Sequence, residues 1–274
     1  KNSLANLEFG GGKATVNSRV SKEHFYEFFA QVLNTLDGSY LTAGDIGTID
    51  QDLIELKKVS PHVCSTKGTD SGQSTAFGVF NAMIGYQEFT NNSGSLKDKR
   101  ILIKGYGKVG SRLAKFCKGA GANIEVVDFE SQRLLIEKDG FKYLRHYTET
   151  TFDQIDIFSP CATGGDINQE FLNFINSVSV KCILGAANNQ LVDKDIESRL
   201  FKLGVTYCPD YCVNAGGVII LALRSSIRED LEYIDIEASE KLIGIKEQLK
   251  KILKLSKETN QLTSISSNQL SEKG

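Results

Sequence analysis

The chain has 274 residues, 41% hydrophobic and 24% charged, a composition typical of a globular protein rather than a disordered or fibrous one. Its 32 Lys and Arg against 34 Asp and Glu give a formal net charge of −2, with no basic excess to hold nucleic acid. The longest purely apolar run, Val218–Leu223, is far shorter than the roughly 20 residues that span a bilayer. We therefore expect no nucleic-acid partner and no membrane segment.

The cysteines and histidines form no pattern typical of a metal site. The six cysteines include no Cys-x-x-Cys pair and the three histidines are widely spread, so we predict no bound metal. No basic and apolar leader opens the chain, and six reduced thiols are typical of a cytoplasmic protein. Residue 1 is Lys rather than Met, which predicts a processed or N-terminally incomplete sequence.

The first part of the chain, about residues 1–78, is predicted to form a smaller α/β domain. Two Gly-rich segments, GGGK at 10–13 and TAGDIGT at 42–48, flank its predicted helices. Thr48 is predicted to cap a helix that runs through Leu56. One face of an earlier helix carries the apolar side chains of Phe25, Phe28, Phe29, Val32 and Leu36.

From about residue 79 to residue 228, strand and helix signals alternate. Short β-rich runs stand at 100–104 (RILIK) and 123–128 (NIEVVD), and three more are IDIFSP, KCILGA and VTYCPD. Helical patterns of ordinary length separate these runs. The alternation predicts the α/β class, with a doubly wound parallel Rossmann sheet in this second domain.

After residue 228, an apolar stripe at helical spacing indicates a long helix over 232–258. The stripe consists of Leu242, Ile245, Leu249 and Ile252. We expect the C-terminal helices of 229–274 to return to the first domain and cover it. The Ser-, Asn- and Gln-rich end at 259–271 is expected to fray.

The segment after the first predicted strand fits the dinucleotide fingerprint G-x-G-x-x-G. Its six positions are Gly105, Tyr106, Gly107, Lys108, Val109 and Gly110. Asp128 ends the next strand 23 residues after Gly105, close to the roughly 20 expected for a ribose-binding carboxylate. Free N–H groups at the start of the following helix would hold the pyrophosphate. The alternative is an ordinary strand-to-helix turn with chance glycines.

Charges near the end of the second strand bear on the choice of cofactor. Asp128 and Glu130 would repel a 2′-phosphate, although Arg133 nearby would attract one, and we predict NAD rather than NADP. Two further segments fall at strand ends, SPCATGG at 159–165 and GAANNQ at 185–190. They are predicted to supply the nicotinamide and ribose site, or else are simple turns.

Lys13 and Asp45 are the candidates for chemistry outside the predicted sheet. A lysine acts as a base near neutral pH only if burial or a neighbouring cation lowers its pKa from about 10.4. Three glycines before Lys13 would let a ligand pack closely, and Lys1, twelve residues earlier, would supply the neighbouring charge. The simpler alternative is a surface lysine after a Gly-rich turn.

The opening segment, KNSLANLEFGGGK, resembles the signature of the glutamate/leucine/phenylalanine/valine dehydrogenase family. In that family a carboxylate-binding lysine stands twelve residues before a catalytic lysine, as Lys1 stands before Lys13. TAGDIGT, GYGKVG, SPCATGG, GAANNQL and PDYCVNAGG resemble further family segments, in the family's order. The last two are most similar to the leucine dehydrogenase branch.

The resemblance implies reversible oxidative deamination, in which an L-amino acid, NAD⁺ and water become a 2-oxo acid, ammonia and NADH. It implies that Lys13 activates the attacking water, that Asp45 exchanges protons with the nitrogen, and that Lys1 binds the α-carboxylate. No metal is implied. Contacts to cofactor or substrate are implied for Thr75, Cys161, Ala162, Asn188 and Asn214.

The resemblance also bears on the substrate, because it implies pocket walls at Ala43, Val218 and Leu221. Leu221 stands where a glutamate dehydrogenase would have a serine, and burying an unpartnered carboxylate against apolar walls is costly. We therefore predict an apolar L-amino acid such as leucine, valine or isoleucine. An aromatic amino acid is the alternative within the family.

The family carries a further N-terminal stretch before the equivalent of Lys1. With that stretch present, the protein is expected to form a homo-oligomer. Its absence from this sequence keeps two other interpretations open, a non-catalytic NAD-binding homologue and one half of a split enzyme. The nearest alternative enzyme is a two-domain dehydrogenase that acts on a hydroxy acid.

Overall fold

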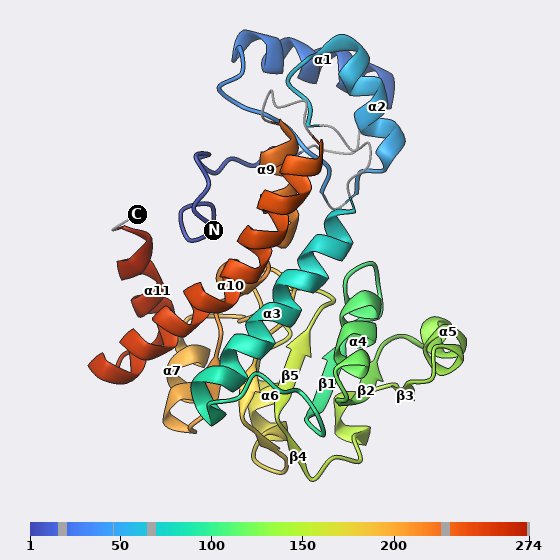
Figure 1. Ribbon diagram of the computed structural model, residues 1–274. Coiled ribbons are helices and arrows are strands. Elements are labelled where there is room, and N and C mark those ends of the chain that lie inside the picture. The colour runs from blue at the N-terminus through green and yellow to red at the C-terminus, as the bar shows by residue number, and fades with distance from the viewer. Residues whose placement is uncertain (16–20, 46, 65–69, 226–230, 273–274) are drawn as a thin grey trace.

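The computed structural model in Figure 1 describes residues 1–15, 21–45, 47–64, 70–225 and 231–272. The helices are α1 (Lys22–Thr35), α2 (Asp50–Val59), α3 (Ser71–Asn91), α4 (Gly110–Gly119), α5 (Arg133–Lys138), α6 (Gln169–Phe174), α7 (Asp195–Lys202), α8 (Asp210–Val213), α9 (Gly216–Ser225), α10 (Leu231–Thr259) and α11 (Thr263–Ser271). The strands are β1 (Arg100–Lys104), β2 (Asn123–Val127), β3 (Lys142–Leu144), β4 (Gln154–Ile155), β5 (Ile157–Pro160), β6 (Ser179–Val180), β7 (Cys182–Ile183) and β8 (Thr206–Tyr207).

A six-stranded sheet forms the centre of the molecule, in the order β3-β2-β1-β5-β7-β8. Each adjacent pair of strands is parallel. The chain builds outward from β1 to β3 and then returns to the other side of β1 with β5. This is the doubly wound order of dinucleotide-binding sheets, so the predicted Rossmann class is confirmed. The predicted strand at 100–104 is β1, with the same bounds.

Both faces of the sheet are covered, because successive strand residues point to opposite sides. Ile101 and Ile103 of β1 are fully buried in a core shared with α3, α4, α9 and α10. Leu102, between them, is fully buried in a second core with α6 and α7. Because both faces of the sheet are buried, its strands have near-continuous apolar sequences, and RILIK in β1 is an example.

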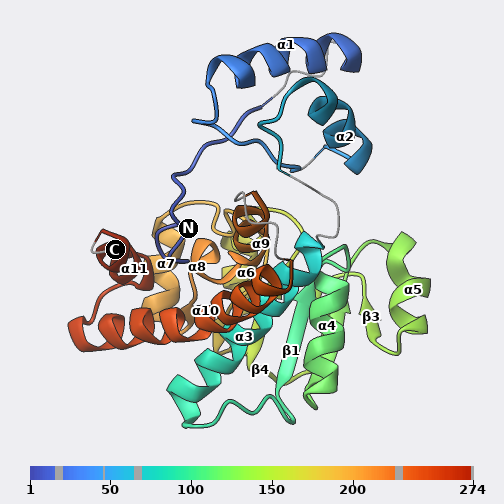
Figure 2. The same ribbon diagram turned by 45° about the horizontal axis from the view of Figure 1, so that its top comes forward.

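The N-terminal region contains helices α1 and α2, which lie beside each other at a distance from the sheet (Figure 2). They share a small core of Ala30, Leu33, Leu53, Leu56 and Val63. Of the β structure expected here, described residues 1–15, 21–45 and 47–64 contain a single parallel bridge, between Thr42 and Val63. The predicted apolar face of α1 is largely exposed, with Phe28 65% exposed, because Ala30 and Leu33 point into the core instead.

The sequence predicts that Thr48 caps α2, but the structure shows that it does not. Its hydroxyl accepts from the Asp45 amide at 2.9 Å and donates to the Asp45 carbonyl at 2.7 Å, which closes the turn that carries Asp45. Ile49 is the residue before the helix, and its N–H donates to the Asp52 carboxylate at 2.9 Å. The helix therefore starts one residue later than a Thr48 cap would place it.

At the C-terminal end, α10 packs along α3, with further contacts to α8, α9 and α11 (Figure 1). The end that was expected to fray forms α11, in which Ser266 and Ser267 are fully buried. Ser3 donates to the Ser271 carbonyl at 2.7 Å, which joins the two ends of the chain. No helix in the described ranges has both the length and the apolar character needed to cross a bilayer.

The division of the chain at residues 78 and 228 remains a prediction. α3 runs without a break from Ser71 to Asn91, so the expected boundary at 78 falls within a helix. This helix packs on the sheet through α4 and on the C-terminal part through α10. Residues 71–78 therefore belong structurally with the sheet.

A glycine pair tests the contact between α3 and α10. A Cβ at Gly85 would lie 2.8 Å from the Lys246 carbonyl oxygen, so Gly85→Ala should lower the free energy of unfolding by about 1–3 kcal/mol. Gly244→Ala in α10 is the matched control, because its Cβ would meet nothing within 4 Å. We expect it to be neutral or stabilising by about 0.5–1 kcal/mol. Urea denaturation measures both, and equal midpoints would contradict the packing described.

Candidate active site

The fingerprint turn lies at the point where the order of the strands reverses, between the carboxyl ends of β1 and β5. Gly105 has a φ of +107°, and a Cβ there would lie 2.7 Å from the Ala162 amide nitrogen. A Cβ at Gly110 would lie 1.9 Å from the Gly105 carbonyl oxygen. Both glycines are therefore required for the turn to close on itself and on the loop after β5. Cys161 lies on the same contact, with its Cβ 3.3 Å from the position of a Gly110 Cβ.

Asp128 lies beside this turn, as its spacing predicted. Its carboxylate accepts from the Tyr106 amide at 2.5 Å and from the Phe129 amide at 2.6 Å. The Tyr106 side chain is buried instead, where its hydroxyl donates to Asp139 at 2.7 Å and burial raises its pKa. Tyr106 thus contributes its backbone to the candidate site, and its ring anchors the turn.

The residues present fit the phosphates of a dinucleotide. Gly107 is exposed, and a Cβ there would meet nothing within 4 Å, so the backbone at this position is open to a ligand. α4 starts at Gly110, shortly after this position, and the start of a helix carries partial positive charge. The turn therefore offers a concave backbone surface with partial positive charge.

Lys108 and Thr75 lie where α3 meets the fingerprint helix and α9. Gly72 allows the Lys108 side chain to pack on α3, since a Cβ there would lie 2.5 Å from Lys108 Cγ. Thr75 donates to the Ser71 carbonyl at 2.7 Å, and its hydroxyl oxygen would be 2.9 Å from a Cβ at Gly217. Thr75 is therefore held in the first turns of α3 against the start of α9.

The loops after β5 and β7 lie against each other. Cys161 N–H donates to the Lys104 carbonyl at 2.7 Å, and Gly165 N–H donates to the Asn189 carbonyl at 2.8 Å. Gln190, which the sequence analysis did not single out, is fully buried and donates to the carbonyls of Gly185 and Ala187. The two strand-end segments predicted to form a nucleotide site are thus adjacent.

Asn188 joins the N-terminal turn to this pair of loops. Its Oδ1 accepts from Lys1 Nζ at 3.2 Å and from Asn214 Nδ2 at 2.9 Å. Asn214 also donates to the Ala186 carbonyl at 3.0 Å. Asn214 Oδ1 is buried and has no hydrogen-bond partner among the described residues, so it is an acceptor available to a ligand.

Lys13 and Asp45 form an ion pair, with Nζ and Oδ2 2.5 Å apart. Their side chains are 64% and 51% exposed, so Lys13 is not buried by the described residues, although the sequence analysis expected a buried base. Burial lowers the pKa of Lys1, the charge of Asp210 raises it, and the charge of Lys13 lowers it further. The two lysines are therefore close enough to influence each other.

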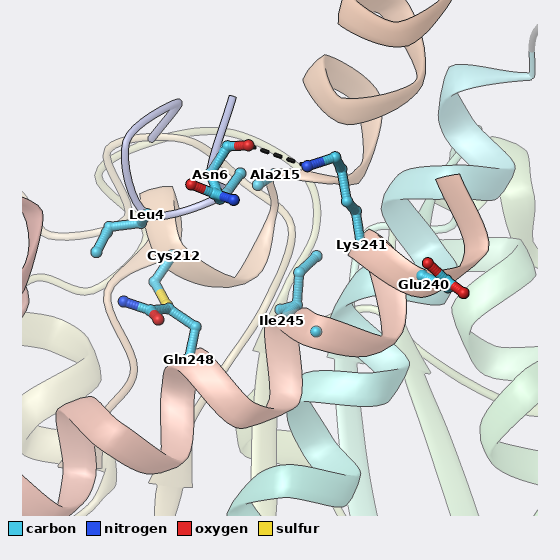
Figure 3. Close-up of a pocket in the computed structure, with 10 residues that line it drawn as sticks. Leu4, Asn6, Cys212, Ala215, Glu240, Lys241, Ile245 and Gln248 are labelled. Carbon is cyan, nitrogen blue, oxygen red and sulfur yellow. Dashed lines mark hydrogen bonds between the residues drawn. The ribbon is translucent and has the colours of Figure 1, made fainter. Parts of the chain in front are cut away.

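The three predicted pocket residues, Ala43, Val218 and Leu221, are each half-buried. Val218 and Leu221 lie three residues apart on α9 and so share one side of that helix. A separate cavity of about 280 Å³ lies beneath the N-terminal turn, between that turn, α8 and α10 (Figure 3). Lys241 Nζ donates to the Asn6 carbonyl at 3.0 Å at its edge.

The described residues include several side chains of the types that bind metals or form disulfides. Within them, no three His, Cys, Asp or Glu side chains are grouped as ligands of a metal ion. The buried thiols of Cys182 and Cys208 are 3.7 Å apart.

Comparison with known proteins agrees with this geometry. A sequence model of the Glutamate/Leucine/Phenylalanine/Valine dehydrogenase family matches residues 135–270. The leucine dehydrogenase of Bacillus subtilis is 31% identical over 266 residues, which cover 93% of this chain and 71% of that protein. The chain belongs to this family. The resemblance stated from the sequence is confirmed.

Family members similar to this chain carry different substrate names. The phenylalanine dehydrogenase of Caldalkalibacillus thermarum is 33% identical over 229 residues, covering 78% of this chain and 61% of that protein. The crystal structure of L-tryptophan dehydrogenase from Nostoc punctiforme matches with a TM-score of 0.83 at 27% identity, covering 99% of this chain and 78% of that one. The chain spans less than two thirds of the length of the phenylalanine dehydrogenase.

The fingerprint of this family member can be tested with two glycines of one helix. Gly110→Ala should open the turn, since the added Cβ would lie 1.9 Å from the Gly105 oxygen. We expect the affinity for NADH, measured by the fluorescence of the nicotinamide, to weaken at least about tenfold. The free energy of unfolding should fall by about 1–3 kcal/mol. Gly119, the last residue of the same helix, is the matched control, because a Cβ there would meet nothing within 4 Å. The Gly119→Ala variant should therefore bind NADH normally. Equal NADH affinities would show that the turn does not hold the cofactor.

Proposed function

We propose that this chain carries the cofactor domain and the reacting groups of an NAD-dependent dehydrogenase that reversibly deaminates an apolar L-amino acid to its 2-oxo acid and ammonia. One observation carries the proposal. Lys1 lies on the segment that also bears Lys13, and it contacts Asn188 in the loop after β7. This loop and the fingerprint turn both lie at the carboxyl ends of the strands. The expected cofactor site and the expected substrate site are thereby brought together.

The charges around Asp128 favour NAD as the cofactor. Asp128 lies where a ribose would bind, and its carboxylate would repel a 2′-phosphate. Arg133, the nearby cation that would attract such a phosphate, is engaged by Glu130 at 3.3 Å and by Glu137 at 2.9 Å. Its positive charge is therefore already balanced.

In this proposal Lys1 and Asn214 orient the substrate. The nicotinamide, when bound, supplies the acceptor for the hydride that leaves the substrate Cα. Lys1 presents an ammonium whose contact partner, Asn188 Oδ1, is neutral, so its charge is available to an α-carboxylate. The unpartnered Asn214 Oδ1 can accept a hydrogen bond from the substrate nitrogen or from the nicotinamide amide.

In this proposal Lys13 and Asp45 move protons. Asp45 Oδ2, 2.5 Å from Lys13 Nζ, can take the proton that Lys13 must lose before it can accept one from water. Both side chains are exposed enough for water and substrate to reach them. Substrate binding would supply the desolvation that the chain by itself does not.

The side chain that fits the substrate pocket is apolar. Val218 and Leu221 offer no hydrogen-bond partner for the distal carboxylate of glutamate. Burying a leucine-sized side chain against them gains about 1.5–3 kcal/mol. An aromatic amino acid is the second candidate, since the similar proteins include a phenylalanine and a tryptophan dehydrogenase.

The remaining expectations form part of the same proposal. The protein would be cytoplasmic, would bind amino acid, 2-oxo acid and ammonia, and would form a homo-oligomer when an N-terminal segment is present. Residues 1–78 would carry the reacting groups, and residues 79–228 would bind the cofactor. Residues 229–274 would form helices that return toward the first domain. A non-catalytic NAD-binding homologue is the competing interpretation.

Substitution of the proton-transfer pair tests the chemistry. Lys13→Ala and Asp45→Asn should each lower kcat by about 10²–10⁴-fold while leaving NADH affinity unchanged, because neither residue lies on the fingerprint turn. Lys58→Ala is the matched control, since it removes an exposed ion pair of similar length, 2.7 Å, with Glu55. Near-normal kcat in Lys13→Ala would contradict the assigned role.

A panel of L-amino acids with NAD⁺ at alkaline pH tests the substrate class. Leucine, valine and isoleucine should have the highest kcat/KM, followed by phenylalanine and tryptophan, as measured by the absorbance of NADH. A higher value for glutamate would overturn the apolar pocket. If no substrate reacts, the same panel with an N-terminally extended chain distinguishes a non-catalytic homologue from half of a split enzyme.

A further inference from the structure

Asp210 is a buried carboxylate at the start of α8 for which the sequence analysis proposed no role. It is 9% exposed and lies within the PDYCVNAGG segment, four residues before Asn214. Its Oδ2 accepts from the Asn189 amide at 3.0 Å, and its Oδ1 accepts from the Tyr207 hydroxyl at 3.2 Å. Its carbonyl accepts from the Asn214 amide at 2.9 Å. Asp210 therefore bonds to both loops that present the asparagines of the candidate site.

The turn that Asp210 holds is one that the backbone does not favour. Asn189 has a φ of +52°, in the left-handed region, which costs a non-glycine residue free energy unless its surroundings hold it. The bond from Asn189 N–H to Asp210 is one such constraint. It places Asn188, the preceding residue, with its Oδ1 between Lys1 Nζ and Asn214 Nδ2.

The charge of Asp210 is not neutralised by its direct partners. The Asn189 amide and the Tyr207 hydroxyl are neutral groups, whereas Asp45 is already in contact with Lys13. Three charged side chains act on Lys1, namely Asp210, Lys13 and Asp45, and among them Asp210 has the largest effect. It opposes the lowering of the Lys1 pKa that burial and Lys13 both cause.

We propose that Asp210 is a positioning residue of the substrate site, which holds the Asn188–Asn189 turn against Lys1 and places a buried negative charge beside the turn that contacts the Lys1 ammonium. The proposal rests on the proposed role of Lys1 as the carboxylate-binding cation. Above its pKa, Lys1 loses its proton and can no longer attract a substrate carboxylate. Asp210 thereby extends the pH range over which the substrate binds.

Asp210→Asn separates the charge from the geometry. The amide oxygen of the variant can still accept from Asn189 N–H, and its NH₂ group can donate to the Tyr207 oxygen, so the turn can stay in place. Tyr207→Phe does the reverse, because it removes one hydrogen bond to Asp210 and keeps the charge. Asp153→Asn is the matched charge control, since that side chain is 89% exposed and pairs with Arg100 at the opposite edge of the sheet.

The first measurement does not require enzyme activity. The reaction of Lys1 Nζ with trace acetic anhydride, followed across pH by peptide mass spectrometry, reports the protonation of Lys1 directly. In Asp210→Asn the labelling midpoint should fall by about half a unit to one unit, because the charge that favours the ammonium is gone. In Tyr207→Phe and Asp153→Asn it should stay where it is in the unchanged protein.

The second measurement uses turnover. In Asp210→Asn the KM for the amino acid should begin to rise at lower pH and be about three- to tenfold higher above the Lys1 midpoint. The KM for NAD⁺ should stay within about twofold. A carboxylate with only a structural role would change both constants, or stability alone, and would not move the pH profile.

The outcomes distinguish this inference from the proposed function. An unchanged Lys1 midpoint in Asp210→Asn overturns the inference, whether or not the protein is active. A shifted midpoint with an unchanged KM for the amino acid shows that Lys1 does not bind the carboxylate, which overturns both that role and the positioning role of Asp210. A shift of the same size in Asp153→Asn would reduce the effect to net charge and also contradict the proposal.

Discussion

The candidate site depends on one close approach of two backbone turns, the turn after β1 and the turn after β5. A side chain at Gly105 would place its Cβ 2.7 Å from the Ala162 amide and push these turns apart. While they stay in contact, the loop after β5 can also meet the loop after β7 through the bond from Gly165 to Asn189. These backbone contacts fix the position of Asn188, and its contacts to Lys1 and Asn214 depend on that position.

The charges of the site are arranged as two lysines and two carboxylates. Lys13 and Asp45 are in direct contact, whereas Lys1 contacts a neutral amide and the charge of Asp210 raises its pKa. Two cations can be kept near each other only if compensating anions are close. Because Lys1 has no anion as its direct partner among the residues that the structure describes, it can accept the carboxylate of a ligand without first breaking an ion pair there.

Much of the fold could be predicted from the sequence, because its signals are local. RILIK became β1, and Asp128 lies beside the fingerprint turn where its spacing from Gly105 had placed it. The predictions that differed depended on competing partners. Thr48 closes the turn at Asp45 rather than capping α2, and the polar end of the chain forms α11 because Ser266 and Ser267 are buried against neighbouring elements.

The sequence by itself determined the class of the sheet, the glycine turn after β1 and the family, because each is encoded in short runs whose periodicity or glycine content meets a backbone requirement. Only the tertiary structure decided that Lys1 meets Asn188, 187 residues away, and that Asp210 holds the turn between them. It also decided that the ring of Tyr106 is buried while its amide faces the site. Contacts of this kind depend on the order of strands in the sheet and on which side chains fill the space between loops, and neither is encoded in neighbouring residues.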